Sequence, residues 1–328
     1  MNTDFRERYL NRLLLIPSVL FCGGMNLTRI AAPEFDLSMT LDSGQVFQWE
    51  RHGAGFIGTI GSRPVYVEQR GEALFVTRSA SALVANYFAL DHPLGQICAA
   101  FPDDSAMSTA RAFCRGLRIL RQPEWECLAS FITSSMKQVA HIRQMSRALR
   151  ERFGEAHRLD DVTFYSYPSA ARLAQATEQE LRACALGYRA KNLRATASLV
   201  ASGEADLSAW RKLTDPELHA RLRELPGVGA KVANCVMLFA YERLRAFPID
   251  VWIERVLKER YFPRARKLTA ERLRLFCDRY FGEHGGYAQQ YLFHHARKTT
   301  PRTRVIPEQK RRRKLSRHSA QPIVSSGK

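Results

Sequence analysis

The segment from Leu225 to Asp250, "LPGVGAKVANCVMLFAYERLRAFPID", constrains the fold more than any other part of this chain. A Pro-Gly-Val-Gly turn runs directly into an apolar stretch that carries a lysine in its first turn. Before the turn, Thr214 and Glu217 form a capping-box pattern that opens a helix. The segment therefore predicts two helices joined by a tight glycine turn.

The turn itself has the features of a phosphate-binding site. A helix that begins near Ala230 presents unpaired backbone N–H groups, and such a helix end attracts an anion. Gly227 and Gly229 permit a positive φ and, without a Cβ, let a sugar-phosphate backbone come close. A P-loop is excluded, because Ala230 precedes Lys231 and Val232 follows it. The pattern resembles a helix-hairpin-helix DNA-binding element, and an ordinary αα-hairpin is the alternative.

Charge and length agree with a partner that is a nucleic acid. The 328 residues include 50 Lys and Arg against 32 Asp and Glu, a net charge of +18 with a pI near 10.0. More than half of this charge lies after residue 296, where Glu308 is the only acid. The rest of the chain is still basic, so the charge favours nucleic-acid binding by the whole protein over a basic tail on an unrelated enzyme. The length suits two domains.

The texture of the chain changes once. Short β-rich runs, "GFIGTI", "PVYVEQ" and "ALFVT", are separated by turns and predict an antiparallel meander. After about residue 123 the apolar residues follow helical spacing. We therefore expect an α+β protein, with an N-terminal antiparallel β-sheet domain at 25–120 followed by an all-helical helix-hairpin-helix domain at 121–297. Residues 1–24 are an N-terminal extension of uncertain status, and 298–328 a basic, disordered tail.

Two features bear on the compartment. The apolar run "YLNRLLLIPSVLF" is too short to span a membrane and lacks a small-residue cleavage site, and Met25 is an equally good start for the protein. The seven cysteines contain no CxxC pair and leave an odd one out, which favours a reducing cell interior. We expect no membrane partner, and a cytoplasmic, nucleoid-associated location if the protein is bacterial.

Lys231 and Asp250 form a candidate catalytic pair. A lysine in a DNA groove is normally a phosphate contact, but Lys231 precedes Cys235 by one turn on an apolar helix, which favours a partly desolvated, nucleophilic amine. Asp250 follows Pro248 and opens an apolar-periodic segment, so it also fits a helix N-cap. An amine paired with a carboxylate suits attack on C1′ of a nucleoside, where the carboxylate stabilises oxocarbenium charge.

These residues make the chain resemble the helix-hairpin-helix DNA glycosylases, and within them the 8-oxoguanine DNA glycosylases, over most of residues 35 to 297. The resemblance implies a bifunctional glycosylase and abasic-site lyase in base excision repair, with Lys231 as nucleophile and Asp250 as acidic partner. It implies no required cofactor. It also implies that a K⁺, Na⁺ or Ca²⁺ ion bridges the hairpin to a phosphate through the carbonyls of Arg223, Leu225 and Val228.

The same resemblance assigns the residues that recognise the base. In "LDSGQVFQW" the Gly44 carbonyl would accept a hydrogen bond from N7–H of 8-oxoguanine, a hydrogen that guanine lacks. Gln289 and Phe293 lie four residues apart on one helix face, where an amide suits a Watson–Crick edge and a ring suits stacking. Cys235 would close the other side of the base.

The chain departs from the family where the opposite strand is read. Eukaryotic members carry asparagine and arginine where this chain has Met136 and His141, whereas Tyr188, the expected wedge, and Arg189, a cytosine contact, are retained. Met136 can still fill the gap left by a flipped base. We therefore expect relaxed selection of the opposite base. Trp252 replaces a phosphate-contacting histidine, which indicates the bacterial-type branch.

Other functions stay open at this level. Only Cys277 lies beyond Cys235, so we expect no iron–sulfur cluster of the kind found in related glycosylases. A glycosylase for a different damaged purine is an alternative, and formamidopyrimidine lesions are a possible second substrate. A non-catalytic helix-hairpin-helix DNA-binding protein explains the charge and the turn but leaves the Lys231 and Asp250 pair without a role. We expect a monomer.

Overall fold

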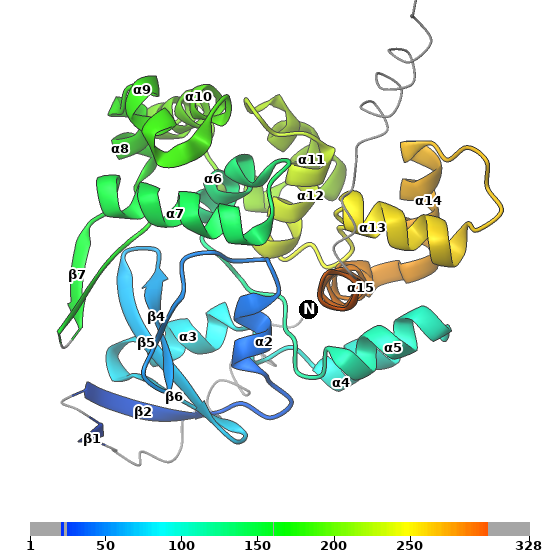
Figure 1. The fold of residues 1–328 in the computed structure, drawn as a ribbon, viewed down its shortest axis with the longest axis horizontal. Helices are drawn as coiled ribbons and strands as arrows, with labels where there is room; N and C mark the ends of the chain where they lie inside the picture. The colour runs from blue at the N-terminus through cyan, green and yellow to red at the C-terminus, as the bar shows by residue number, and fades with distance from the viewer. Residues whose placement is uncertain (1–20, 23–24, 160, 301–328) are drawn as a thin grey trace, which may run out of the picture.

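The structure, a computed structural model, describes residues 21–22, 25–159 and 161–300. An antiparallel sheet with its own helices comes first in the chain, and a larger helical assembly follows (Figure 1). The predicted α+β class is confirmed. Most of the N-terminal extension, and the tail from residue 301, lie outside the described residues.

The sheet has six strands in the order β1-β2-β6-β5-β4-β3, all antiparallel. The predicted meander is confirmed in β4, β5 and β6. Strand β2, which the sequence patterns did not predict, pairs with β6 and places Leu27 opposite Thr77. The strands are β1 (Phe21–Cys22), β2 (Met25–Ala31), β3 (Glu50–His52), β4 (Gly55–Ile60), β5 (Arg63–Arg70) and β6 (Ala73–Thr77).

Four helices that the sequence patterns did not predict also lie in the first part of the chain: α2 (Leu37–Asp42), α3 (Ser81–Tyr87), α4 (Leu94–Ala99) and α5 (Ser105–Phe113), of which α4 and α5 pack against the last helix. Helix α2 begins where the Asp36 side chain accepts a hydrogen bond from Met39 N at 2.8 Å. One face of the sheet buries its alternating valines against α3, in a cluster that contains Tyr87 and Phe88. Burial of these large side chains fixes α3 on the sheet.

The second half of the chain is mainly helical, and its two predicted capping boxes, Thr177 with Glu180 and Thr214 with Glu217, are both present. The last helix extends to Thr299, so the first residues of the predicted tail are helical. The helices are α6 (Glu124–Ser134), α7 (Val139–Phe153), α8 (Ala170–Gln175), α9 (Glu178–Leu181), α10 (Arg189–Ser202), α11 (Asp215–Glu224), α12 (Ala230–Phe239), α13 (Val251–Val256), α14 (Ala270–Phe281) and α15 (Gly285–Thr299).

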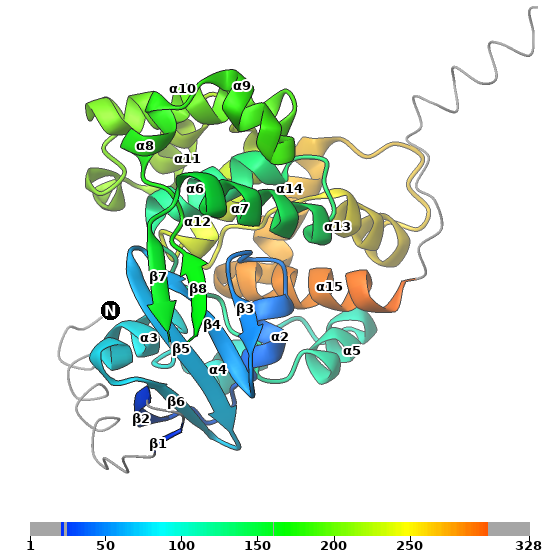
Figure 2. The ribbon, with the colours of Figure 1, turned by 60° about the vertical axis from the view of Figure 1, so that its left-hand side comes forward.

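The prediction that this half is all-helical is wrong at one place. Strands β7 (Ala156–Leu159) and β8 (Val162–Tyr165) form a hairpin that lies over the sheet (Figure 2). The hairpin buries Phe164 among side chains of the sheet, which include Ile57 and Tyr66. The hairpin therefore buries the second face of the sheet, although it belongs to the other half of the chain.

Helix α15 joins the two halves. It packs against α13 on one side and against α4 and α5 on the other, and in both views it lies between them (Figures 1 and 2). The amide of Gln290 donates to the carbonyl of Ser43 at 2.9 Å, which ties α15 to the end of α2. Helix α15 therefore links the N-terminal half of the chain to the helical half.

Candidate active site and DNA interface

The predicted hairpin is present, with a rigid turn between α11 and α12. Val228 N donates to the carbonyl of Leu225 at 3.1 Å, and Thr196 Oγ1 donates to the carbonyl of Pro226 at 2.9 Å. Gly227 has a φ of +83°, and a Cβ there would lie 2.9 Å from Cβ of Asn192. The turn therefore requires glycine at 227 for both its backbone conformation and its packing.

Gly229 differs from Gly227 because the protein leaves space around it. It is exposed, it is the N-cap of α12 without a side-chain cap, and a Cβ there would meet no atom within 4 Å. The first N–H groups of α12 thus face open space at the positive end of the helix dipole. Within the described residues, no N–H donates to the carbonyls of Arg223 or Val228, so both keep oxygens that a cation can use.

Lys231, the second residue of α12, points toward α6. Its Nζ lies 3.4 Å from Oγ of Ser134 and 5.0 Å from the centre of the Phe131 ring, and the side chain is half-buried. Cys235 follows one turn later and is 3 % exposed. Burial raises the pKa of the Cys235 thiol to about 11, although the charge of Lys231 acts in the opposite direction. The thiol is therefore a neutral neighbour of the amine.

Asp250 caps α13, as the sequence predicts. Its Oδ1 accepts from the backbone N–H groups of Trp252 at 3.1 Å and Ile253 at 2.9 Å. Burial raises the pKa of the Asp250 carboxyl, while these two bonds and the charge of Lys231 oppose that rise. The lysine and the aspartate thus interact electrostatically, although no direct ion pair joins them.

Gly44 lies in the turn after α2, with a φ of +87°. A Cβ there would lie 3.1 Å from Cε1 of Phe293 and 3.3 Å from Cγ2 of Val139, so the Gly44 backbone is in contact with α15 and α7. The neighbouring carbonyls of Ser43 and Gln45 accept glutamine amides. Within the described part of the chain, nothing donates to the Gly44 carbonyl. It remains an available acceptor in an otherwise bonded turn.

Gln289 is 3 % exposed, and its Oε1 has no hydrogen-bond partner among the described residues. A buried amide oxygen without a partner is unfavourable, and such groups in native structures indicate a ligand or a functional site. Phe293, one turn further along α15, is half-buried and faces Gly44. The structure therefore brings Gly44 and Phe293 together, with the unpaired Gln289 oxygen on the same helix.

Met136 and Tyr188, two of the predicted DNA contacts, are among the large apolar side chains exposed on the surface. Met136, in the turn between α6 and α7, is 91 % exposed and has a φ of +56°, and Tyr188 is 58 % exposed. A methionine in this backbone region is strained, and strain of this kind clusters at functional sites. Both positions fit residues that enter DNA.

Arg189 is placed differently from an exposed base reader. It is 5 % exposed and donates from Nε to the carbonyl of Ser135 at 3.0 Å and from Nη1 to that of Leu186 at 3.3 Å. It therefore fastens the turn that carries Met136, and its predicted cytosine contact stays a prediction. The other two predicted DNA contacts lie at helix starts: His141 is exposed on α7, and Trp252 is half-buried on α13.

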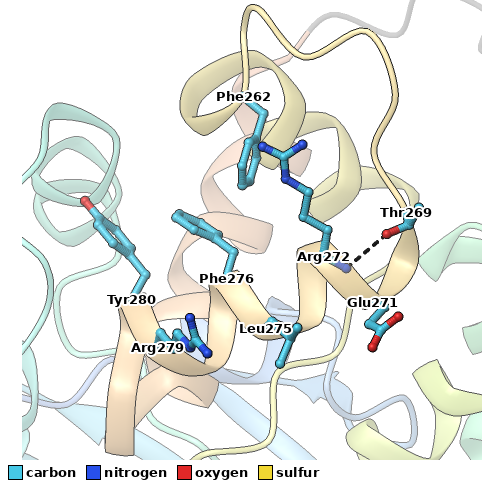
Figure 3. A pocket seen from close by; sticks show the side chains of 8 residues that line it. All are labelled: Phe262, Thr269, Glu271, Arg272, Leu275, Phe276, Arg279 and Tyr280. Carbon is cyan, nitrogen blue, oxygen red and sulfur yellow. Dashed lines mark hydrogen bonds between the residues drawn. The ribbon is translucent and has the colours of Figure 1, made fainter.

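A hollow of about 630 Å³ lies elsewhere, along α14 (Figure 3). It contains none of the predicted site residues, so it is separate from the candidate active site. Its lining is mostly aromatic and arginine side chains: Phe262, Thr269, Glu271, Arg272, Leu275, Phe276, Arg279 and Tyr280. In the described part of the chain, no group of three or more His, Cys, Asp or Glu side chains is placed to hold a metal ion. None of the described helices has both the length and the hydropathy of a membrane-spanning segment.

A glycine hairpin that presents a lysine near a helix-capping aspartate, in a helical assembly joined to an antiparallel sheet, defines a helix-hairpin-helix base-excision glycosylase. Comparison with known proteins narrows the class. Residues 28–128 match the family described as 8-oxoguanine DNA glycosylase, N-terminal domain, and residues 129–279 match the HhH-GPD superfamily of base excision DNA repair proteins. The chain belongs to the 8-oxoguanine DNA glycosylase family.

Individual relatives agree over most of their length. The Clostridium acetobutylicum 8-oxoguanine glycosylase/lyase, solved with DNA containing cytosine opposite 8-oxoguanine, is 31 % identical with a TM-score of 0.79, over 84 % of this chain and 96 % of that one. The Arabidopsis thaliana N-glycosylase/DNA lyase OGG1 is 29 % identical over 81 % of this chain and 78 % of its own. A 3-methyladenine DNA glycosylase from Archaeoglobus fulgidus, 18 % identical with a TM-score of 0.68, shares the fold.

Proposed function

We propose that this protein is a bifunctional DNA glycosylase and abasic-site lyase that removes 8-oxoguanine from double-stranded DNA in base excision repair. The observation that carries the proposal is Lys231, held at the start of the hairpin helix and electrostatically coupled to the helix-capping Asp250. A non-catalytic DNA-binding module would leave the Lys231 and Asp250 pair without a role. The relatives from Arabidopsis thaliana and Clostridium acetobutylicum, about 30 % identical over most of the chain, are glycosylase/lyases.

The reaction begins with Lys231 as a free amine. Its nitrogen forms a bond to C1′ as the bond from C1′ to N9 breaks, the electron pair leaves with the base, and the base takes up the proton that the newly bonded nitrogen releases. Positive charge develops on the sugar, and the Asp250 carboxylate stabilises it. Ring opening gives a Schiff base on Lys231, after which loss of a proton from C2′ expels the 3′ phosphate by β-elimination.

Base selection rests on two acceptors that have no hydrogen-bond partner within the described part of the chain. The Gly44 carbonyl accepts from N7–H of 8-oxoguanine, whereas guanine would place a lone pair there. The buried Oε1 of Gln289 accepts from the Watson–Crick edge, and its lack of a partner supports this role. Phe293 stacks on one face of the base, with Cys235 on the other. Formamidopyrimidine lesions present a similar edge and are a proposed second substrate.

DNA is held by the hairpin and by the charge of the whole chain. The uncapped start of α12 offers N–H groups to a phosphate next to Gly229, where the protein leaves space. A K⁺, Na⁺ or Ca²⁺ ion held by the carbonyls of Arg223, Leu225 and Val228 would supply positive charge for the same phosphate. The proposal needs no other cofactor, and a monomer suffices because one chain supplies every residue of the site.

The opposite strand is contacted mainly by apolar groups. Met136 fills the gap left by the flipped base and Tyr188 wedges the duplex, and their exposure supports both roles. His141 and Trp252 replace polar contacts of the eukaryotic members, which favours the bacterial-type branch. In a bacterium the enzyme would act on the nucleoid in the cytoplasm.

Borohydride trapping tests the proposal. The protein, incubated with a duplex that carries 8-oxoguanine opposite cytosine and then reduced, should form a covalent adduct with DNA, because borohydride reduces the Schiff base. Lys231→Gln should abolish the adduct, and Lys212→Gln, at an exposed lysine on a different element, should retain it. An adduct that survives Lys231→Gln rules out this nucleophile. An adduct with formamidopyrimidine but none with 8-oxoguanine would favour the different-purine alternative.

A further inference from the structure

We infer that Asp42 is a positioning residue for base selection, because it fixes the Gly44 turn to the two helices that carry the base-stacking and opposite-strand residues. This inference rests on the proposed function. Asp42 is the last residue of α2, two positions before Gly44. Its side chain is one-third exposed and forms ion pairs with three cations on two other elements, Arg143, Arg297 and Lys298.

The first set of contacts joins the turn to α15. Lys298 Nζ lies 2.5 Å from Oδ2 of Asp42, and Arg297 Nη2 lies 3.6 Å from the same oxygen. The same Arg297 nitrogen donates to the backbone carbonyl of Asp42. Arg297 also lies over the Phe293 ring, with its Cζ 5.9 Å from the ring centre. One arginine therefore contacts both the Asp42 backbone and the proposed stacking residue.

The orientation of Arg297 is itself constrained. Its side chain is 16 % exposed, and Nη2 lies 3.2 Å from Nδ1 of His294. Burial and the charge of Arg297 lower the pKa of His294 to about 4, so this imidazole is neutral at physiological pH and its Nδ1 can accept from the guanidinium. The guanidinium of Arg297 is therefore held between the Asp42 carbonyl and the His294 ring.

The second set of contacts joins the turn to α7. Arg143 Nη2 donates to Oδ1 of Asp42 at 3.1 Å and to the carbonyl of Leu41 at 3.2 Å. Helix α7 also supplies Val139, whose methyl group lies next to Gly44, and it begins just after the exposed Met136. The carboxylate therefore holds the recognition turn against both helices.

An exposed ion pair alone contributes little to folding stability. The position of Asp42 gives it a different consequence, because a catalytic or recognition group displaced by about 1 Å loses up to roughly 100-fold in rate. Removing the Asp42 charge should therefore change base selection more than folding. Lyase action on a preformed abasic site needs Lys231 but no base, so it should not depend on the position of Gly44.

The test compares three rates for Asp42→Asn and the wild type in single-turnover reactions. We expect excision of 8-oxoguanine to fall about tenfold, its ratio to guanine excision to narrow, and cleavage of a preformed abasic site to stay within about twofold, at an unchanged melting temperature. Lys298→Gln should cause a smaller loss, and none in the Asp42→Asn background, because the pair is already broken. Asp278→Asn is the matched control and should behave as the wild type, because it breaks a 2.8 Å ion pair between Asp278 on α14 and Arg245, away from the proposed site.

Unchanged 8-oxoguanine excision in Asp42→Asn would overturn the inference. So would equal losses of excision and abasic-site cleavage together with a lower melting temperature, because these indicate a general structural role. Failure of the proposed function looks different, since the wild type itself would then not excise 8-oxoguanine.

Discussion

Lys231 and Asp250 lie at the starts of two different helices, and the charge of the lysine opposes the rise that burial causes in the pKa of the aspartate. Asp250 therefore has two functions, because the same carboxylate caps α13 and supplies negative charge to the site. A substitution that keeps the cap and removes the charge can therefore isolate the second function.

Asp250→Asn should reduce 8-oxoguanine excision on the order of 100-fold while the melting temperature stays the same. Asparagine caps a helix about as well as aspartate, whereas it cannot stabilise positive charge on the sugar. Asp250→Ala should lose both functions, with an added stability loss of about 1 kcal/mol. Single-turnover kinetics and thermal melts measure the two effects. An equal decrease in melting temperature for Asp250→Asn and Asp250→Ala would contradict the prediction that asparagine keeps the helix cap.

The pH dependence of excision should report Asp250. Burial raises the pKa of its carboxyl above the ordinary value of 3.8, and the ionised form is the one that stabilises the sugar cation. Lowering the pH through this raised pKa should therefore reduce the excision rate at a pH where an ordinary aspartate is still ionised. The acidic fall should be absent from the residual activity of Asp250→Asn. A pH profile of single-turnover rates for both proteins gives the comparison, and an identical acidic fall would assign it to another group.

The two hairpin glycines should fail in different ways. Gly227→Ala places a Cβ 2.9 Å from Asn192 on a backbone with φ of +83°, so it should destabilise the fold by about 1 kcal/mol or more. Gly229→Ala meets no protein atom within 4 Å and should leave the melting temperature unchanged. It should nevertheless weaken binding to undamaged duplex DNA, because the new methyl group occupies the space proposed for a phosphate. Thermal melts and salt-controlled binding titrations check both variants, and unchanged binding by Gly229→Ala would move the phosphate elsewhere.

Selection of the opposite base should be weak. Met136 offers no hydrogen bond, and the donors of Arg189 already serve the carbonyls of Ser135 and Leu186. We expect excision of 8-oxoguanine opposite C, A, G and T to agree within about tenfold, since a missing hydrogen-bond reader removes the main source of discrimination. Met136→Ala should slow all four alike. Single-turnover rates on the four duplexes test this, and a strong preference for cytosine would indicate that Arg189 leaves its carbonyls on binding.

Local patterns in the sequence predicted the hairpin and its helix ends well. The hairpin, the lysine one residue inside α12 and the cap at Asp250 all depend on a turn and two helix ends, and each is set by residues a few positions apart. Partners that are distant in the sequence were not predictable in this way. Asp42 and Arg297 lie 255 residues apart, and neither residue type indicates the other.

Tertiary contacts also determine features that local sequence patterns did not predict. The family resemblance assigns Arg189 to a cytosine contact, and the fold adds a contact that the sequence did not predict, because the side chain is 5 % exposed and donates to the carbonyl of Ser135. Strands β7 and β8 have only four residues each, so the pattern that they carry in the sequence is weak. Its stability comes from Phe164, which packs on a sheet formed by another part of the chain.

Glu126 should make the protein less stable as the pH rises. It is 4 % exposed between the two halves, where its carboxyl accepts from the amide of Gln48 and from Gly61 N at 3.3 Å. Burial raises its pKa to about 8 from an ordinary 4.5. Between these values the folded protein keeps a proton that the unfolded chain releases, so the free energy of unfolding falls as the pH increases, and above about 8 this dependence ends.

Glu126→Gln removes this ionisation and should keep its stability over the same range. The difference in the free energy of unfolding between the variant and the wild type, measured by denaturant unfolding, should therefore grow in favour of the variant from about pH 5 to pH 8, up to a few kcal/mol, since each unit of pKa shift corresponds to about 1.4 kcal/mol. Glu151→Gln, at an exposed glutamate paired with Arg147 at 2.8 Å, controls for charge and should follow the wild type. Parallel pH curves for the Glu126 variant and the wild type would show that the buried carboxyl is ionised in the folded protein, with Arg150 the nearby charge that would stabilise it.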